Sequence, residues 1–461
     1  MKNSSVFALL RSFSTSERRS FRQWLHAPVH FQRPDGRRLF DLLVATDFAE
    51  PDRETLYHQL FEPPYDDARL RQTLHFLRRA AEDFLLHRHR AAQPDRELLL
   101  SRLLTARGLP RLGEQLLRRA QKSWRNRPER DYRALLHHYE LELDTYAQEV
   151  RHHRAPSEQL QRVVTAFDAA YLTNRLRLAC MQISQQRAFT SAADEGLLPA
   201  LLPLLDAYAL PPVARVYYLL YRSFAEPDAD WFARFQRAQE EYRAVFSTDN
   251  RRDLYLLSIN YCIPKINAGD DSYRTVVLDI YRGALDEGLL IDNGVFSRFA
   301  FKNIVTLALA AGEYDWTETF IQTYRDYLPA AHRDNLANLN LARLYYERHD
   351  YERARAVLPP ADHADVMTNL NARTLLLKIY YEQNARRALE SHLESTRTYL
   401  RRHRPDVQKT TMYKNLFSCT RQLLQLTPYR RRATEKLRTR VETLPQLAER
   451  AWLRERVAEF G

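Results

Sequence analysis

Histidine is the residue type in this sequence best suited to metal or proton chemistry. Several histidines occur in three short clusters, which are His87 with His89, His137 with His138, and His152 with His153. Only His138 and Glu142 have the i, i+4 spacing that places two ligands on one helix face, whereas a zinc site needs at least three protein ligands. No third ligand stands at a suitable spacing. The sequence therefore predicts no metal site and predicts that these histidines lie on solvated helix faces.

The motifs of common catalytic sites are also missing. The glycines of "GLPRLG" (108–113) resemble those of a phosphate-binding loop, but Glu114 and Gln115 follow where Lys and Ser or Thr are required. None of the eight lysines follows an acidic residue by two positions, so a nuclease motif ending in [DE]-x-K has no candidate. There is no G-x-S-x-G and no H-E-x-x-H. We predict a protein that is not an enzyme, with no catalytic residue and no cofactor.

Positive charge is concentrated near the C-terminal end of the sequence. The net charge is +12, and residues 401–461 contribute +9 of it. Thirteen cations between residues 397 and 440 oppose only Asp406 and Glu435. They are Arg397, Arg401, Arg402, Arg404, Lys409, Lys414, Arg421, Arg430, Arg431, Arg432, Lys436, Arg438 and Arg440. Such a basic patch can bind a nucleic-acid backbone, an acidic protein or a membrane surface, or it can be the solvated face of a capping element.

The elements that position these side chains are predicted to be helices. The chain has 10 glycines, far fewer than the roughly 32 that an average usage of about 7% would give. Sheets need glycine because tight hairpin turns require positive φ. Leu, Ala, Arg and Glu are abundant, and they lose little on entering a helix. The sequence therefore predicts an all-α fold.

Cysteine spacing and hydropathy predict a cytoplasmic protein. Cys180, Cys262 and Cys419 are too far apart in the sequence for a metal or redox pair, and we expect them to be buried thiols in a reducing compartment. The apolar run at residues 6–10 is too short for a signal peptide. The weakly charged stretch 196–214 contains four prolines, which interrupt any membrane-spanning helix. We expect no integral membrane association.

Changes of pattern along the chain predict four parts. Residues 1–92 form an N-terminal helical module, residues 93–295 degenerate helical hairpins, residues 296–403 repeats, and residues 404–461 basic C-terminal helices that act as a cap. In the N-terminal module, Ser14 and Glu17 have the spacing of a capping box. A longer helix then presents an apolar stripe that begins at Leu70. The module is either the cap of a helical array or a helix-turn-helix nucleic-acid reader.

The third part contains a repeating pattern. Tyr-Tyr-Glu occurs at 345–347 and again 35 positions later, at 380–382. In the clearest unit, Leu341 and Ala342 are followed by Tyr345, a turn at 349–351 and the small residue Ala354. These residues resemble the tetratricopeptide repeat (TPR), in which two antiparallel helices occupy about 34 residues. One good unit and two degenerate ones cover 296–403. The layout is also similar to a group of uncharacterised long bacterial all-helical proteins.

The resemblance implies a right-handed, TPR-like helical-repeat solenoid whose first helices line a binding groove. The groove positions that it implies are Lys302, Thr306, Arg343, Tyr346, Asn371, Thr374, Lys378 and Tyr381, so that each unit places one cation near the groove. The expected function is a non-enzymatic scaffold that binds a protein or peptide, with an acidic segment as the candidate ligand. The alternative is a nucleic-acid-associated regulator that uses the N-terminal helices and the basic patch.

Overall fold

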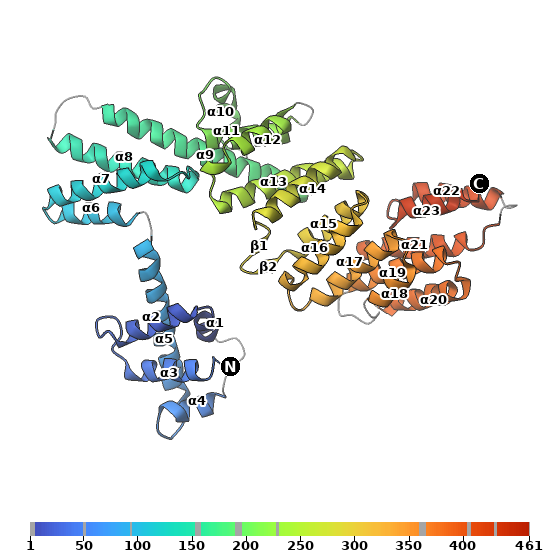
Figure 1. Cartoon of the computed structure of the whole chain (residues 1–461), viewed down its shortest axis with the longest axis horizontal. Coiled ribbons are helices and arrows are strands. Elements are labelled where there is room, and N and C mark those ends of the chain that lie inside the picture. Colours follow the sequence, from blue (N-terminus) through green and yellow to red (C-terminus); the bar gives the residue numbers. More distant parts are fainter. Residues whose placement is uncertain are drawn as a thin grey trace. The chain divides into compact units, whose positions relative to one another are not determined.

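A computed structural model of the chain describes residues 5–48, 52–92, 95–152, 158–189, 196–226, 230–358, 366–402, 407–427 and 431–460. Of the side chains, those of 90–92, 151–152, 187–189 and 407–409 are not described. The described residues of the chain contain 23 α-helices and one two-stranded antiparallel hairpin (Figure 1). The prediction of an all-α fold is confirmed apart from that short hairpin. The chain divides into two compact units, residues 1–174 and 175–461.

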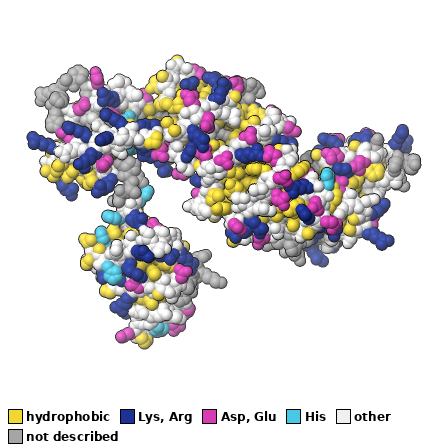
Figure 2. All heavy atoms as spheres, in the orientation of Figure 1, with side chains coloured by type: hydrophobic (Ala, Val, Ile, Leu, Met, Phe, Trp, Pro, Cys, Tyr) yellow, Lys and Arg dark blue, Asp and Glu magenta, His cyan; other side chains and the backbone are white. Residues whose placement is uncertain are grey.

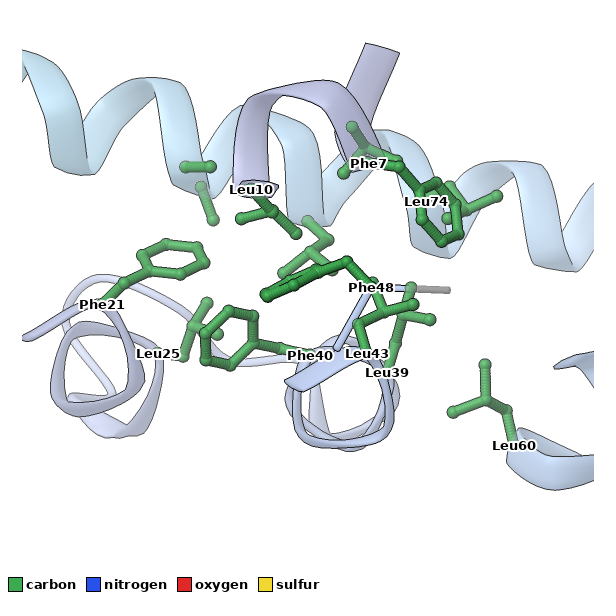
Figure 3. Close-up of a cluster of buried hydrophobic side chains, with 14 of the residues drawn as sticks. Phe7, Leu10, Phe21, Leu25, Leu39, Phe40, Leu43, Phe48, Leu60 and Leu74 are labelled. Atoms are coloured by element: carbon green, nitrogen blue, oxygen red, sulfur yellow. The ribbon is translucent and has the colours of Figure 1, made fainter. Parts of the chain in front are cut away.

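The first unit begins with the N-terminal module. Its helices are α1 (Ser5–Arg11), α2 (Thr15–His26), α3 (Pro34–Ala45), α4 (Arg53–Leu60) and α5 (Asp67–Ala92). The first four all contact α5. Phe21 and Phe40 are in ring contact, with 5.0 Å between their centres, and Phe7 lies beside Leu74 of α5 in the same core (Figure 3). The apolar stripe of α5 is buried within this module, so the predicted long helix forms part of the module's hydrophobic core.

The predicted capping box begins α2. The Glu17 amide donates to Ser14 Oγ at 3.2 Å, and the Ser14 amide donates to Glu17 Oε2 at 2.8 Å. Hydrogen bonds from Ser14 and the positive charge of Arg88 lower the pKa of the Glu17 carboxyl. The next helix, α3, begins at Pro34, because proline is well tolerated in a first helical turn.

The rest of the first unit consists of α6 (Arg96–Ala106), α7 (Pro110–Asn126), α8 (Tyr132–His152) and most of α9 (Glu158–Phe189), which continues past the boundary at residue 174. The glycines of "GLPRLG" serve the turn between α6 and α7. Gly108 has φ +77°, and a side chain at Gly113 would come within 3.0 Å of the Ser101 carbonyl oxygen. They allow two helices to pack closely, which accounts for this pattern without a bound phosphate.

The second unit begins with further helices and the hairpin. They are α10 (Leu198–Leu205), α11 (Pro212–Ala225), α12 (Trp231–Glu241), a 3₁₀ turn (Arg243–Val245), α13 (Thr248–Asn267), α14 (Ser272–Asp286), β1 (Ile291–Asp292) and β2 (Val295–Phe296). Helix pairs α11 with α12 and α13 with α14 pack against each other. Asp270 Oδ1 accepts from the Ser272 amide at 3.2 Å, which stabilises the start of α14.

Three helix pairs follow, at the positions where the repeats were predicted. They are α15 (Arg298–Ala310) with α16 (Tyr314–Tyr324), α17 (Arg333–Glu347) with α18 (Tyr351–Val357), and α19 (Val366–Glu382) with α20 (Arg386–Arg402); a 3₁₀ turn (Arg325–Tyr327) follows α16. The two helices of each pair contact each other, and α17 contacts both α15 and α19. Ala342 and Ala354 are fully buried together between α17 and α18, because small side chains allow the two helices to approach.

The three pairs share one turn geometry. Gly312, His349 and Asn384 each have positive φ, immediately after the first helix of the pair. In each turn the next amide donates to the carbonyl oxygen five residues earlier, from Glu313 to Ala308, from Asp350 to Tyr345 and from Ala385 to Tyr380. This is the Schellman arrangement of a helix end. The two Tyr-Tyr-Glu triplets therefore occupy equivalent places, in the last turns of α17 and α19.

The C-terminal part contains α21 (Val407–Leu423), α22 (Arg431–Thr443) and α23 (Arg450–Ala458). α21 contacts both α22 and α23. Trp452 and Leu453 of α23 are buried in a core shared with Leu377 of α19. All three cysteines are buried, as predicted. Within the described parts of the chain, we find no helix that is both long and apolar enough to span a bilayer.

Candidate functional site: a cationic groove

The second unit contains a groove of about 880 Å³. Helices α15, α17, α19 and α21 line it, together with residues that precede α17 and α23. Six of the eight predicted groove residues lie on its wall: Lys302, Arg343, Tyr346, Asn371, Thr374 and Lys378. They are spaced by three, four or seven residues within a helix, which places them on one face of each helix.

Among the described residues, Arg343, Lys302 and Arg298 are cations of the groove wall with no acidic partner, and Arg343 and Lys302 lie close enough to affect each other's charge. In the described part of the chain, no carboxylate lies within ion-pair distance of either. Burial lowers the pKa of the Arg343 guanidinium, and the more distant charges of Glu449 and Glu347 oppose this effect. Packing and the charge of Arg343 also lower the pKa of Lys302, although much of that side chain is exposed. Two mutually repelling cations favour a bound anion.

Thr306 supports Arg343 without lining the groove. Its hydroxyl donates to the Lys302 carbonyl oxygen at 2.8 Å and accepts from Arg343 Nη1 at 3.2 Å. The Thr306 hydroxyl therefore links the backbone of α15 to a guanidinium on α17. Thr306 is exposed but is not among the residues that line the groove, so its position differs from the predicted one.

Lys378 differs from the other two predicted cations because it is already paired. Its Nζ lies 2.9 Å from Glu449 Oε2 and 4.6 Å from the centre of the Tyr346 ring. Only 13% of the Lys378 side chain is exposed. Glu449 precedes α23 and has φ 52°, a left-handed conformation that few residues other than glycine adopt. A carboxylate of the chain itself thus neutralises one groove cation.

Thr374 provides an unusual polar group in the groove wall. It is 5% exposed, and its Oγ1 has no hydrogen-bond partner among the residues that the structure describes. A buried hydroxyl without a partner is uncommon in folded proteins. One helical turn earlier, the Asn371 Oδ1 accepts from Tyr413 Oη at 2.9 Å, so the amide is oriented by α21. Thr374 therefore has an unused capacity to bind a polar group.

The two groove tyrosines predicted from the repeated triplet have different positions. Tyr346 lines the groove, and its hydroxyl donates to Glu382 Oε1 at 3.4 Å. Burial and the charge of Glu382 raise the pKa of the Tyr346 hydroxyl. Tyr381 does not line the groove but packs edge-on against Trp452, with 5.3 Å between ring centres. α23 covers this end of α19, so Tyr381 has a packing role.

Several groove residues were not predicted from the sequence. Phe299, at the start of α15, is 67% exposed and lies in the groove wall beside Arg298. Asn335 and Leu339 precede Arg343 by eight and four residues, so the helical period could have indicated them. Glu449 could not have been found in this way because it lies far outside the repeat region.

The basic patch is partly neutralised in the structure. Arg397 and Arg421 both pair with Glu394, at 3.8 and 2.6 Å, and Arg438 pairs with Glu435 at 2.9 Å. Arg440 Nη2 donates to Ser418 Oγ at 3.1 Å. The exposed cations with no ion pair among the described residues are Arg401, Arg402, Lys414, Arg431, Arg432 and Lys436. Arg404, Arg430 and the Lys409 side chain lie outside the described residues.

Basic side chains are not confined to that end. Figure 2 shows Lys and Arg spread over the visible face, with acidic side chains among them. The net charge of residues 397–440 overstates the positive charge of the patch. Glu394 lies three residues before that range and pairs with two of its arginines.

The central histidines are less solvated than predicted. His138 stacks on Trp124 with 4.5 Å between ring centres and contacts Glu142 at 3.1 Å. His137 is only 11% exposed and lies beside Asp95. His87 and His89 are exposed, as expected, whereas the side chains of His152 and His153 lie outside the described residues. Among the residues that the structure describes, no group of three metal-ligating side chains occurs.

Comparison with models of known families, with curated proteins and with solved structures found no match to this chain. The interpretation of the groove therefore rests on its own residues.

Proposed function

We propose that this protein is a non-enzymatic scaffold whose groove binds an acidic segment of another protein. The observation that carries the proposal is the pair of unneutralised cations, Lys302 and Arg343, in a groove of about 880 Å³. Charge-assisted hydrogen bonds to such groups contribute about 1.5 to 3 kcal/mol each. A carboxylate placed between the two cations also removes their mutual repulsion.

The architecture that we propose is a right-handed, TPR-like array. Three helix pairs with the same Schellman turn support it, as do the two fully buried alanines at the α17–α18 crossing. In an array of this kind the first helices of successive pairs lie side by side and form one surface. The contacts of α17 with both α15 and α19 agree with that arrangement.

The groove also offers groups for the rest of a peptide. The exposed ring of Phe299 provides an apolar contact at one end. The Thr374 hydroxyl and the oriented amide of Asn371 can bond to peptide groups near the middle. We therefore expect the bound segment to be extended, with an acidic side chain near Arg343 and an apolar side chain near Phe299.

The direct test is binding of a labelled peptide that contains alternating glutamate and leucine, measured by fluorescence anisotropy. Lys302→Glu combined with Arg343→Glu should weaken binding about a hundredfold or more, because each reversal removes an attraction worth more than about 1.4 kcal/mol. A matched control is Arg401→Glu with Lys414→Glu, which reverses two exposed cations of the basic patch and should leave the affinity unchanged.

The same two double variants decide between the scaffold and the nucleic-acid alternative. Affinity purification from the native host, with and without nuclease, should recover a nuclease-resistant protein partner that only the groove variant loses. If only the patch variant lost its partners, and these were nuclease-sensitive, the nucleic-acid function would be favoured. Retention of every partner and of the peptide by the groove variant would show that the proposal is wrong.

A further inference from the structure

Helices α8 and α9 carry apolar stripes that the groove does not use. On α8 the stripe comprises Leu136, Tyr139, Leu143, Tyr146 and Val150, and on α9 it comprises Leu160, Val164, Phe167 and Tyr171. The intervals alternate between three and four residues on both helices. This is the 3.5-residue period with which a helix presents one seam to another helix. No charged residue interrupts either stripe.

These stripes are exposed to an unusual degree for such side chains. Leu136 and Val150 of α8 are 49% and 51% exposed, and Leu160 and Phe167 of α9 are both 48% exposed. Leu143, Val164 and Tyr171 are also exposed, at 38%, 45% and 37%. Apolar side chains at such positions are normally covered by another helix. This face therefore has the residue pattern of a helix–helix interface, but no helix among the described residues covers it.

The two stripes meet in one surface. Tyr139 and Phe167 are in ring contact, with 5.2 Å between their centres, and Phe167 stacks with Tyr171 at 6.3 Å. Near the start of α9, the Gln159 amide donates to the Glu142 carbonyl oxygen at 3.2 Å. Two neighbouring helices that present apolar seams on a common side have the form of one half of a four-helix bundle.

We propose that this face binds the same face of a second copy of the chain, so that α8 and α9 of two copies form a four-helix bundle. An identical partner fits because a two-fold interface must be self-complementary, and a seam without charges brings no like charges together. Seven half-exposed side chains of this size form a patch of roughly 600 Å², the upper end of what monomers expose. Two such patches bury roughly 1,200 Å², which reaches the range of stable interfaces.

The proposal does not depend on the function of the groove, because every residue in it belongs to the first unit. The test is the mass of the full chain in solution, measured by sedimentation velocity over a wide range of concentrations. The wild-type protein should sediment as a dimer of the 54.5-kDa chain. Val164→Glu with Phe167→Glu should raise the dimer dissociation constant by about a hundredfold or more, because it buries unpaired charges in the seam.

A matched control changes two apolar side chains that are at least as exposed but lie elsewhere. Leu86 of α5 and Leu204 of α10 are 56% and 66% exposed. Leu86→Glu with Leu204→Glu should therefore leave the dimer intact. Circular dichroism should show equal helix content in both double variants. A wild-type chain that stays monomeric at all concentrations, or a dimer that survives the seam substitutions, would overturn the proposal.

Cross-linking tests the same contact with a milder change. Val164→Cys keeps the side chain small, and the native cysteines are buried and so do not compete. A short bis-maleimide should link two copies of Val164→Cys, and it should not link two copies of Leu86→Cys. Equal cross-linking of both variants would indicate random collision and would contradict the proposed interface.

Discussion

Thr374 shows how one side chain can serve binding at the expense of stability. The residue is buried in α19, yet its hydroxyl has no partner, while Asn371 and Lys378 on the same face are both engaged. Leaving a buried polar group unpaired costs about 1 to 3 kcal/mol. A hydroxyl at this position is accounted for if a ligand pairs with it.

Thr374→Val should separate these two effects. The substitution keeps the shape and removes the unpaired hydroxyl, so we expect the free energy of unfolding to rise by about 1 kcal/mol. Binding of the acidic peptide should weaken. Thr317→Val is the matched control, because Thr317 is equally buried but its hydroxyl donates to the Glu313 carbonyl oxygen at 2.6 Å. That variant should lose about 1 kcal/mol. Urea unfolding measures both, and equal losses would contradict the interpretation of Thr374.

At the scale of single residues, the resemblance to the tetratricopeptide repeat indicated much of the groove. It implied Lys302, Arg343 and Lys378 because they occupy the inward-facing positions of the first helices. The resemblance could not reveal that Glu449, more than seventy residues later, neutralises Lys378. It also could not show that α23 covers Tyr381, because a contact between distant segments leaves no trace in local spacing.

Among the features of the helices, the structure of their ends follows most directly from the sequence. Ser14 and Glu17 form the predicted capping box at the start of α2. α1 was not predicted because its seven residues are too few to show a helical period. His349 adopts a left-handed turn where glycine stands in the preceding pair, and its residue type gave no indication of that conformation.

The capping box makes the stability of α2 depend on pH. The pKa of Glu17 is lowered in the folded chain, so its contribution is present above the ordinary carboxyl pKa and is lost as the pH falls through the lowered value. Ser14→Ala should therefore cost about 1 kcal/mol at neutral pH. The cost should become smaller once the pH falls below the lowered pKa of Glu17, because the carboxyl is then protonated. Thermal unfolding followed from neutral pH through the acid range measures the difference, and a cost independent of pH would contradict a role for the Glu17 charge.

At the scale of the whole molecule, the separate cores predict that a substitution in one core destabilises that core and leaves the stability of the other unchanged. Phe7, Phe21 and Phe40 belong to one core, whereas Ala342 and Ala354 belong to another in the second unit. The sequence predicted an all-α chain, because its scarcity of glycine applies along its whole length. The division after residue 174 was not predicted, since α9 continues through it without a break in its helical pattern.

Ala354→Leu should test this independence. The larger side chain overfills the α17–α18 crossing and should destabilise the second unit by about 1 to 3 kcal/mol. Hydrogen exchange followed by mass spectrometry should show faster exchange in α17 to α20 and unchanged protection in α1 to α5. Ala310→Leu, at an exposed position on α15, should change neither. Loss of protection throughout the chain would instead mean that the two units unfold together.

The ion pair between Lys378 and Glu449 has a consequence for how the groove would rank its ligands. A first carboxylate that reaches Arg343 and Lys302 gains an attraction without breaking another. A second carboxylate directed at Lys378 must displace Glu449, so its gain is largely cancelled by that loss. The groove would then discriminate by the position of a single acid in the ligand. A glutamate directed at Lys378 would then add little to the affinity that a glutamate between Arg343 and Lys302 provides.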